Sequence, residues 1–199
     1  MKKPLISIIV PMFNSEKTIY QCLNSLINQN VKYAYEIVVI DDGSNDRTSK
    51  IINSFTTKSK KVLYYRNKIN LGGTESRNIG IHNSRGDILV FTDSDCIAKN
   101  KWLKSIVKPI LAGKGFLVQG YSDGDKTSIW QAITQESYDL FIKTIKNNGY
   151  ANRIDTRNCA IHRDVFNKIG LFNGNLKRSG DAEFGLRAIE AGFKIIYKR

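Results

Sequence analysis

The 199-residue sequence is poor in residues that form disulfides or bind structural metals, with three cysteines and two histidines. The cysteines, Cys22, Cys96 and Cys159, are odd in number, far apart and outside any CxxC or Cys–His pair, which excludes a disulfide framework and a structural zinc site. His82 and His162 lack a second histidine at metal-binding spacing. These features favour a reducing compartment, and we expect a cytoplasmic protein.

Long hydrophobic runs are also missing. A transmembrane helix needs about 20 consecutive apolar residues. The N-terminal apolar run is interrupted by Pro11, Asn14 and Glu16 before it reaches that length or the length of a signal peptide. We therefore expect that this sequence does not cross a membrane.

Acidic residues are scarce: the sequence has 18 aspartates and glutamates but 31 lysines and arginines, which gives a formal charge of +13. This excess predicts attraction to an anionic partner such as a nucleotide, a nucleic acid or an acidic lipid surface. The alternative is that many of these lysines only solvate their helices. The residues open to both interpretations include Lys58, Lys60, Lys61, Lys143 and Lys146.

The composition, with 41% hydrophobic residues, is that of a globular protein, and the length suits one domain. Apolar runs rich in β-branched residues predict buried strands at 5–11, 35–42, 62–66, 87–93 and 116–121. Apolar residues at three- and four-residue spacing predict helices at 16–29, 46–58, 74–84 and 100–112. This alternation predicts a doubly wound α/β fold, in which helices cover both faces of a mostly parallel sheet.

The pattern is less regular after residue 122. There we expect a long amphipathic helix at 128–146 and a short strand at 158–162. A helix from Asp164 and a last helix at 181–190, ended by Gly192, should follow.

Ligands of doubly wound sheets bind beyond the carboxyl ends of the strands, so the loops after the strands are the candidate sites. In the first such loop, Pro11 ends a strand, and Phe13 either covers a nucleobase or packs under the next helix. In the second, Asp41 and Asp42 are adjacent carboxylates that a base imide or a ribose hydroxyl would explain, while Gly43 allows the turn.

A third loop contains Asp93 and Asp95. If the strand runs through Asp93, the two carboxylates point to the same side and form a site for a hard cation such as Mg²⁺ or Mn²⁺. A second DxD pattern, at 123–125, is better explained as a solvated turn. Cys96 fits a small buried residue and not a nucleophile.

Two further segments carry candidate groups. Gly73 lies in a glycine turn before a helix, and Arg77 either holds a pyrophosphate or braces an acid. Asp181 and Glu183 begin a late helix, where Asp181 is either a helix cap or a catalytic base.

Taken in order, VPMFN, VVIDDGSNDRT, NLGGTESRNIG, FTDSD, NCAIHRDVFNKIGLF and SGDAEFGLR resemble the motifs of family 2 glycosyltransferases with the GT-A fold, from Leu5 to about Tyr197. The resemblance implies an inverting enzyme of hexosyltransferase type. Such an enzyme moves a sugar from a nucleoside diphosphate sugar, UDP-sugar before GDP-sugar, to a hydroxyl of a carbohydrate or lipid-linked acceptor, with Mn²⁺ or Mg²⁺. It would work in polysaccharide or glycolipid synthesis, in contact with the anionic inner face of the cell membrane and without nucleic acid.

The resemblance also assigns roles to residues. Asp181 is the catalytic base, Asp95 and Asp93 bind the metal, and Asn158 and Glu183 lie on the acceptor side. The residues assigned to the nucleotide are Pro11, Phe13, Asn14, Asp42, Gly73, Arg77 and Asp93. Residues 1–199 would form one domain, with a donor-binding half at 1–121 and an acceptor-side half at 122–199.

The sequence departs from the family pattern in places. Gly180 replaces a glutamate before the base, and TRNCAIHRD replaces the usual GANLAFRR stretch. The QxxRW motif of processive synthases is missing, and the sequence stops at Arg199, as a domain truncated at its C-terminus would.

Other functions stay open at this point. A non-catalytic nucleotide-binding domain would keep the motifs without turnover, and a basic module for nucleic acid or membranes would use only the charge. A sugar nucleotidyltransferase would share the sheet and the metal acids. It should have a glycine-rich loop after the first strand, where this chain has PMFNSEK.

Overall fold

The structure is a computed structural model that describes residues 5–124, 135–136, 139–140, 146–147, 149–176 and 179–199. Strands and helices alternate through its first part, as the sequence predicts. The strands are β1 Ile6–Met12, β2 Tyr35–Asp41, β3 Val62–Arg66, β4 Ile88–Phe91, β5 Leu117–Gly120, β6 Lys146–Asn147, β7 Tyr150–Ala151, β8 Cys159–His162 and β9 Ile195–Lys198. The helices are α1 Ile19–Ile27, α2 Thr48–Lys58, α3 Gly73–His82, α4 Trp102–Leu111, α6 Arg163–Ile169 and α7 Gly180–Glu190.

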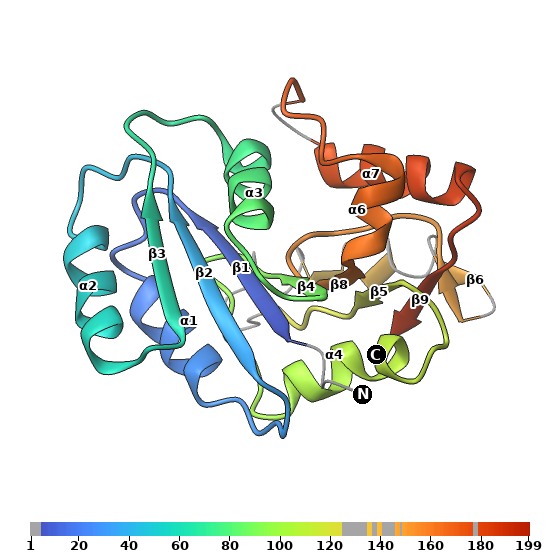
Figure 1. Ribbon diagram of the computed structural model, residues 1–199, viewed down its shortest axis with the longest axis horizontal. Helices are drawn as coiled ribbons and strands as arrows, with labels where there is room; N and C mark the ends of the chain where they lie inside the picture. The colour runs from blue at the N-terminus through green and yellow to red at the C-terminus, as the bar shows by residue number, and fades with distance from the viewer. Residues whose placement is uncertain (1–4, 125–134, 137–138, 141–145, 148, 177–178) are drawn as a thin grey trace.

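The central strands are buried on both faces because helices cover both faces of the sheet (Figure 1). One apolar cluster packs α1, α2 and α4 against one face. A second cluster packs α3, α6 and α7 against the other, and its centre is a group of aromatic rings with centroids 4.7–6.1 Å apart. These rings belong to Phe91, Phe166, Phe172 and Phe184. The predicted α/β class is confirmed.

Within the described residues the sheet has nine strands in the order β3-β2-β1-β4-β8-β5-β9-β7-β6. β1 pairs in parallel with β2 and β4, and β3 pairs in parallel with β2. β8 is antiparallel to both of its neighbours, β4 and β5. The segment that precedes β8 therefore reaches the same edge of the sheet as the loops that follow β1, β2 and β4.

Two expectations about the elements need correction. β4 ends at Phe91 and does not run through Asp93. The Thr92 amide still donates to the Ile9 carbonyl of β1, but the chain then turns, and the Cys96 amide donates to the Asp93 carbonyl. Most of the helix expected at 128–146 lies outside the described residues. The described residues 135–136 and 139–140 are helical, as expected, whereas the last residue of the range, Lys146, belongs to β6. β6 and β7 are two residues long, too short to produce a periodic pattern in the sequence. In the part of the chain that is described, no helix has the length and apolar character of a membrane span.

Candidate active site

Two adjoining cavities open at the edge of the sheet where β1, β2 and β4 end. The first, here called the β1 cavity, has a volume of about 360 Å³. Its lining residues are Pro11, Met12, Phe13, Asp42, Asn70, Gly72, Gly73, Ser76, Arg77, Asp93, Ser94 and Asp95. The second, here called the α7 cavity, has a volume of about 520 Å³. Its lining residues are Gly73, Thr74, Arg77, Asp93, Arg153, Asp155, Thr156, Arg157, Phe172, Ser179, Gly180 and Asp181.

Gly73, Arg77 and Asp93 line both cavities and so form their common wall. Nη2 of Arg77 donates to Oδ1 of Asp93 at 2.6 Å, and the two side chains are 16% and 29% exposed. Burial raises the pKa of the Asp93 carboxyl, and the Arg77 guanidinium opposes that rise only in part. Of the two roles that the sequence left open for Arg77, the structure shows the one in which it braces an acid.

The neighbouring acids Asp41 and Asp42 differ in what they contact. Asp41 is fully buried, and its carboxylate accepts hydrogen bonds from the Ser44 amide and from the hydroxyls of Ser49 and Tyr64, at 2.8–2.9 Å. Burial raises the pKa of Asp41, but these hydrogen bonds outweigh it, so the pKa lies below its ordinary value. A ligand is not needed to explain Asp41.

Asp42 lines the β1 cavity but also holds the loop that leads into α3. Its Oδ1 accepts from Asn67 Nδ2 at 2.8 Å and from the Leu71 amide at 2.9 Å, and its Oδ2 accepts from the Gly72 amide at 2.7 Å. A carboxylate has about four lone-pair positions. Room for a base or ribose contact is therefore limited, and nucleotide binding by Asp42 stays a prediction.

The loop after β1 presents an aromatic ring to the β1 cavity. Phe13 lines that cavity and is 45% exposed, so it is not packed under α1 as the alternative interpretation expected. Pro11 lines the same cavity. Asn14 does not: it adopts a left-handed backbone with φ 49°, and its side-chain oxygen accepts from the Asn45 amide. Asn14 therefore shapes the loop.

The exposed carboxylate of Asp95 lines the β1 cavity beside Asp93. Among the described residues, no group of three or more histidines, cysteines, aspartates or glutamates could hold a metal ion. A Mg²⁺ site that is completed by substrate phosphates needs only one or two carboxylates, because water and phosphate oxygens supply the other ligands. Asp95 and Asp93 fit this kind of site, although Arg77 already occupies one oxygen of Asp93.

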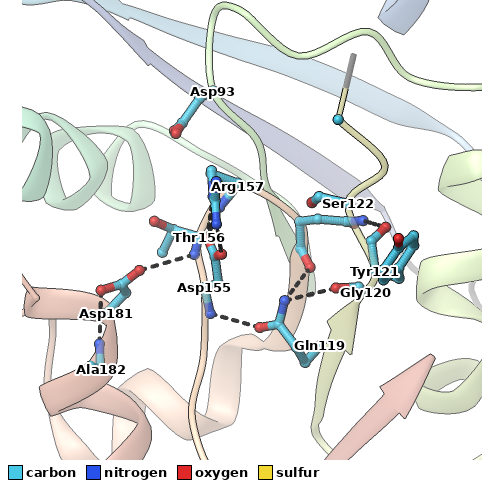
Figure 2. A network of polar contacts seen from close by, with 12 residues as sticks. Asp93, Gln119, Gly120, Tyr121, Ser122, Asp155, Thr156, Arg157, Asp181 and Ala182 are labelled. Atoms are coloured by element: carbon cyan, nitrogen blue, oxygen red, sulfur yellow. Dashed lines mark hydrogen bonds and ion pairs between the residues drawn. The ribbon is translucent and has the colours of Figure 1, made fainter. Parts of the chain in front are cut away.

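Asp181 lies in the first turn of α7 and lines the α7 cavity. Its Oδ1 accepts from the Ala182 amide at 2.9 Å, and its Oδ2 accepts from the Thr156 amide at 3.3 Å (Figure 2). Gly180, just before it, faces Thr74 so closely that an added Cβ would lie 3.1 Å from the threonine side chain. Glycine at this position lets α7 approach the start of α3.

The segment 153–157 forms a wall of the α7 cavity that the sequence analysis did not assign to the site. Asp155 and Arg157 form an ion pair with 2.6 Å between Nη2 and Oδ2. The segment comes just before a predicted strand, whereas in a parallel sheet the site lies at the loops that follow the strands. Because β8 is antiparallel, the residues at its start reach the site.

The two residues assigned to the acceptor side do not line the α7 cavity. Asn158 accepts from Trp102 Nε1 at 2.9 Å and donates to the Tyr121 carbonyl at 2.7 Å, so its amide joins α4, β5 and the start of β8. Glu183 forms an ion pair with Arg187 on the same helix. Arg187 in turn donates to backbone carbonyls at 169 and 171 and so ties α7 to the end of α6.

Comparison with known protein families identifies the family of this chain. The model of glycosyl transferase family 2 matches residues 7–170, which include all residues that line the β1 cavity and the whole segment 153–157. The chain belongs to glycosyl transferase family 2. This confirms the resemblance found in the sequence motifs.

Relatives of the chain include the glycosyltransferase AglE of Haloferax volcanii, which is 31% identical over 202 residues that cover 98% of this chain and 64% of AglE. An uncharacterized glycosyltransferase of Haemophilus influenzae is 39% identical over 153 residues, covering 75% of this chain and 60% of that protein. The chain therefore spans less than two thirds of the length of these relatives.

Solved structures of glycosyltransferases share the fold. The mannosyltransferase PcManGT from Pyrobaculum calidifontis, in complex with GDP-Man and Mn²⁺, superposes with a TM-score of 0.79 at 18% identity, covering 99% of this chain and 55% of that one. Staphylococcus aureus TarS 1–349 in complex with UDP-GlcNAc gives 0.72 at 22% identity, covering 98% and 58%. The mixed α/β fold with its mostly parallel sheet thus matches the GT-A glycosyltransferases.

Proposed function

We propose that the chain transfers a sugar from a nucleoside diphosphate sugar to an acceptor hydroxyl with inversion, and that Asp181 is the general base. One observation carries this proposal: the β1 cavity and the α7 cavity share the wall of Gly73, Arg77 and Asp93. A donor in the β1 cavity would therefore place its sugar at that wall, facing the α7 cavity that Asp181 also lines.

The β1 cavity suits a nucleotide. Phe13 offers an exposed ring for stacking on a base, and Gly73, the first residue of α3, would let the helix N-terminus approach the phosphates. Asp95, with Asp93 beside it, would hold a divalent cation together with the diphosphate. When bound, that cation would stabilise the negative charge of the departing diphosphate. Arg77 keeps Asp93 in place through their ion pair.

The α7 cavity suits the acceptor. Asp181 would take the proton from the attacking hydroxyl, on the side of the sugar opposite the diphosphate, so a single displacement inverts the anomeric carbon. The Thr156 and Ala182 amides fix both carboxylate oxygens, which orients the base before the acceptor arrives. A covalent nucleophile is not required.

We propose UDP as the nucleotide and GDP as the next choice. TarS has been solved with UDP and with UDP-GlcNAc, whereas PcManGT has been solved with GDP-Man and Mn²⁺. Calorimetry with each nucleoside diphosphate, with and without Mn²⁺, should show UDP binding more tightly than GDP and only with the metal. Tighter binding of GDP would change the assignment of the base.

The test of the mechanism is Asp181→Asn. Asparagine keeps the size of the side chain and one of the two acceptor oxygens, so nucleotide binding should stay close to that of the natural protein. The loss of one amide hydrogen bond should lower thermal stability only slightly. Transfer should fall by about a hundredfold or more, the range expected for loss of a general base. The measurement is nucleotide release from the sugar nucleotide with the best acceptor in a panel of free sugars, sugar alcohols and lipid-linked sugars. Near-normal transfer by this variant would remove Asp181 from the mechanism.

The acceptor is proposed to be a carbohydrate or a lipid-linked sugar at an anionic membrane surface, on the basis of the formal charge of +13. Co-sedimentation with anionic vesicles at low salt, lost as salt rises, would support the membrane contact. Equal binding to neutral vesicles, or none to anionic ones, would exclude it.

A further inference from the structure

We infer that Gln119 is a positioning residue for Asp181, acting through the backbone of residues 155 and 156. This inference rests on the proposed function of Asp181 as the base. Gln119 lies in β5, does not line either cavity and is fully buried. It was not among the residues that the sequence motifs pointed to.

A buried glutamine is costly unless its amide is hydrogen-bonded at both ends. Its neighbours in β5, Leu117 and Val118, are apolar, and an apolar side chain would pack at position 119 without this requirement. Both ends of the Gln119 amide are hydrogen-bonded: Nε2 donates to the carbonyls of Gly120 and Asn158 at 2.9 and 3.2 Å, and Oε1 accepts from the Asp155 amide at 2.7 Å.

The hydrogen bond from the Asp155 amide connects Gln119 to the candidate site. The next amide along the chain, that of Thr156, donates to Oδ2 of Asp181. In Figure 2 the segment 155–157 passes between Gln119 of β5 on one side and Asp181 of α7 on the other. A hydrogen bond at residue 155 thus fixes the peptide group that precedes the donor to the base.

The other hydrogen bonds of Asp155 and Asn158 hold the segment together and join its far end to β5. The Asp155 carboxylate accepts from the amide and the guanidinium of Arg157, and the Asp155 carbonyl accepts from the Asn158 amide, so residues 155–158 form a turn held within itself. At its far end the turn is joined to β5 through Asn158. Among these contacts, the Gln119 oxygen is what joins the near end, at Asp155, to the sheet.

The test is Gln119→Met, which keeps the length and approximate volume of the side chain and removes all three hydrogen bonds. A matched control exists in Gln29, which is 7% exposed. Its Nε2 donates to the carbonyls of Ser25 and Lys99, and its Oε1 accepts from the Leu103 amide, so Gln29→Met removes the same set of bonds away from both cavities. Both variants should lose comparable thermal stability.

The rate of sugar transfer should distinguish Gln119→Met from Gln29→Met. Gln119→Met should lower kcat about tenfold or more and leave the affinity for UDP with Mn²⁺ unchanged, whereas Gln29→Met should retain kcat. The decisive measurement is the double variant with Asp181→Asn. If Gln119 acts through the base, Gln119→Met should cost little further in that background. An equal loss in both backgrounds would overturn the inference and make Gln119 only a stabiliser of the fold.

Hydrogen exchange gives a readout that does not depend on transfer. The Thr156 amide should exchange at least severalfold faster in Gln119→Met, with no such change in Gln29→Met, and unchanged exchange would overturn the inference. If Asp181→Asn alone transfers normally, the proposed base is wrong. The exchange rate of Thr156 then still shows whether Gln119 holds this segment, so the two failures can be told apart.

Discussion

Arg77 and Asp93 face each other at the boundary between the two cavities, with 2.6 Å between Nη2 and Oδ1. Arg77→Met would leave the mostly buried Asp93 carboxylate without its counter-charge. We expect the Kd of UDP in the presence of Mn²⁺ to rise about tenfold, which corresponds to about 1.4 kcal/mol. Arg47 offers a control, since it pairs with Glu16 but is 80% exposed. Arg47→Met should bind UDP normally, and normal binding by Arg77→Met would show that the ion pair does not organise the site.

Phe13→Ala tests whether the ring contacts the base. Because the ring is 45% exposed, its removal should cost little stability. It should weaken UDP binding by about 1–3 kcal/mol, the range for stacking of a base on an aromatic side chain. Phe116 is 44% exposed but packs on His162 and Phe193, away from both cavities, so Phe116→Ala is the matched control for calorimetry. An equal UDP affinity for both variants would exclude stacking.

The fold could be predicted from the sequence because its signals are local. Strands such as β1 and β2 are mostly apolar and rich in β-branched residues, and helices such as α1 and α4 have a clear apolar face. The acids at the ends of β2 and β4 could be found for the same reason, since a parallel sheet brings those ends to one edge. The family motifs then placed Asp181 at this edge from far along the chain.

The parts of the site that were not predicted depend on the direction of a strand and on the partners of individual side chains. The wall at 153–157 was missed because its position requires β8 to be antiparallel, which a four-residue strand does not reveal. Glu183 and Asn158 were assigned to the acceptor by motif. Glu183 lies four residues before Arg187 on α7, a spacing at which the sequence already indicates an ion pair within the helix. Asn158 accepts from Trp102, 56 residues away in the sequence, and no pattern in the sequence specifies that contact.

Asp95→Ala should abolish the dependence of UDP binding on Mn²⁺ without reducing thermal stability. Asp95 is exposed in the β1 cavity, so a carboxylate there contributes little to the core. Asp123 provides the control because it also lies in a DxD pattern, is exposed and pairs only loosely with Lys99, at 3.9 Å. Asp123→Ala should keep metal-dependent binding. A large loss of stability in Asp95→Ala would instead make Asp95 a structural acid.

The stability of the chain should fall in acid partly through Asp41. Its folded-state pKa lies below the ordinary value, so its contribution is present above pH 4 and is lost as pH falls through the folded-state pKa. Asp41→Asn should therefore lower the free energy of unfolding at pH 7 by about 1–3 kcal/mol and flatten its decline below pH 4. Urea unfolding at several pH values measures both effects. An unchanged acid slope would show that Asp41 does not contribute to it.

Gly185 decides how closely α7 can approach the segment that carries Thr156. It lies four residues after Asp181, on the same face of α7, and an added Cβ would lie 2.9 Å from the Ile154 backbone nitrogen and 3.3 Å from Arg153 Cα. These are backbone atoms, so in Gly185→Ala the helix itself must move. The substitution should improve helix propensity by about 1 kcal/mol and still destabilise the fold.

The displacement should also separate Asp181 from the Thr156 amide, and Gly185→Ala should therefore lower transfer while UDP binding with Mn²⁺ is retained. Leu186→Ala alters the next residue, which is 58% exposed and lies on the outer face of α7, and it should leave transfer unchanged. Because the shift acts on the base, the loss in Gly185→Ala should appear in kcat for every acceptor that the chain accepts. A loss confined to UDP affinity would mean that α7 supports the donor and not the base.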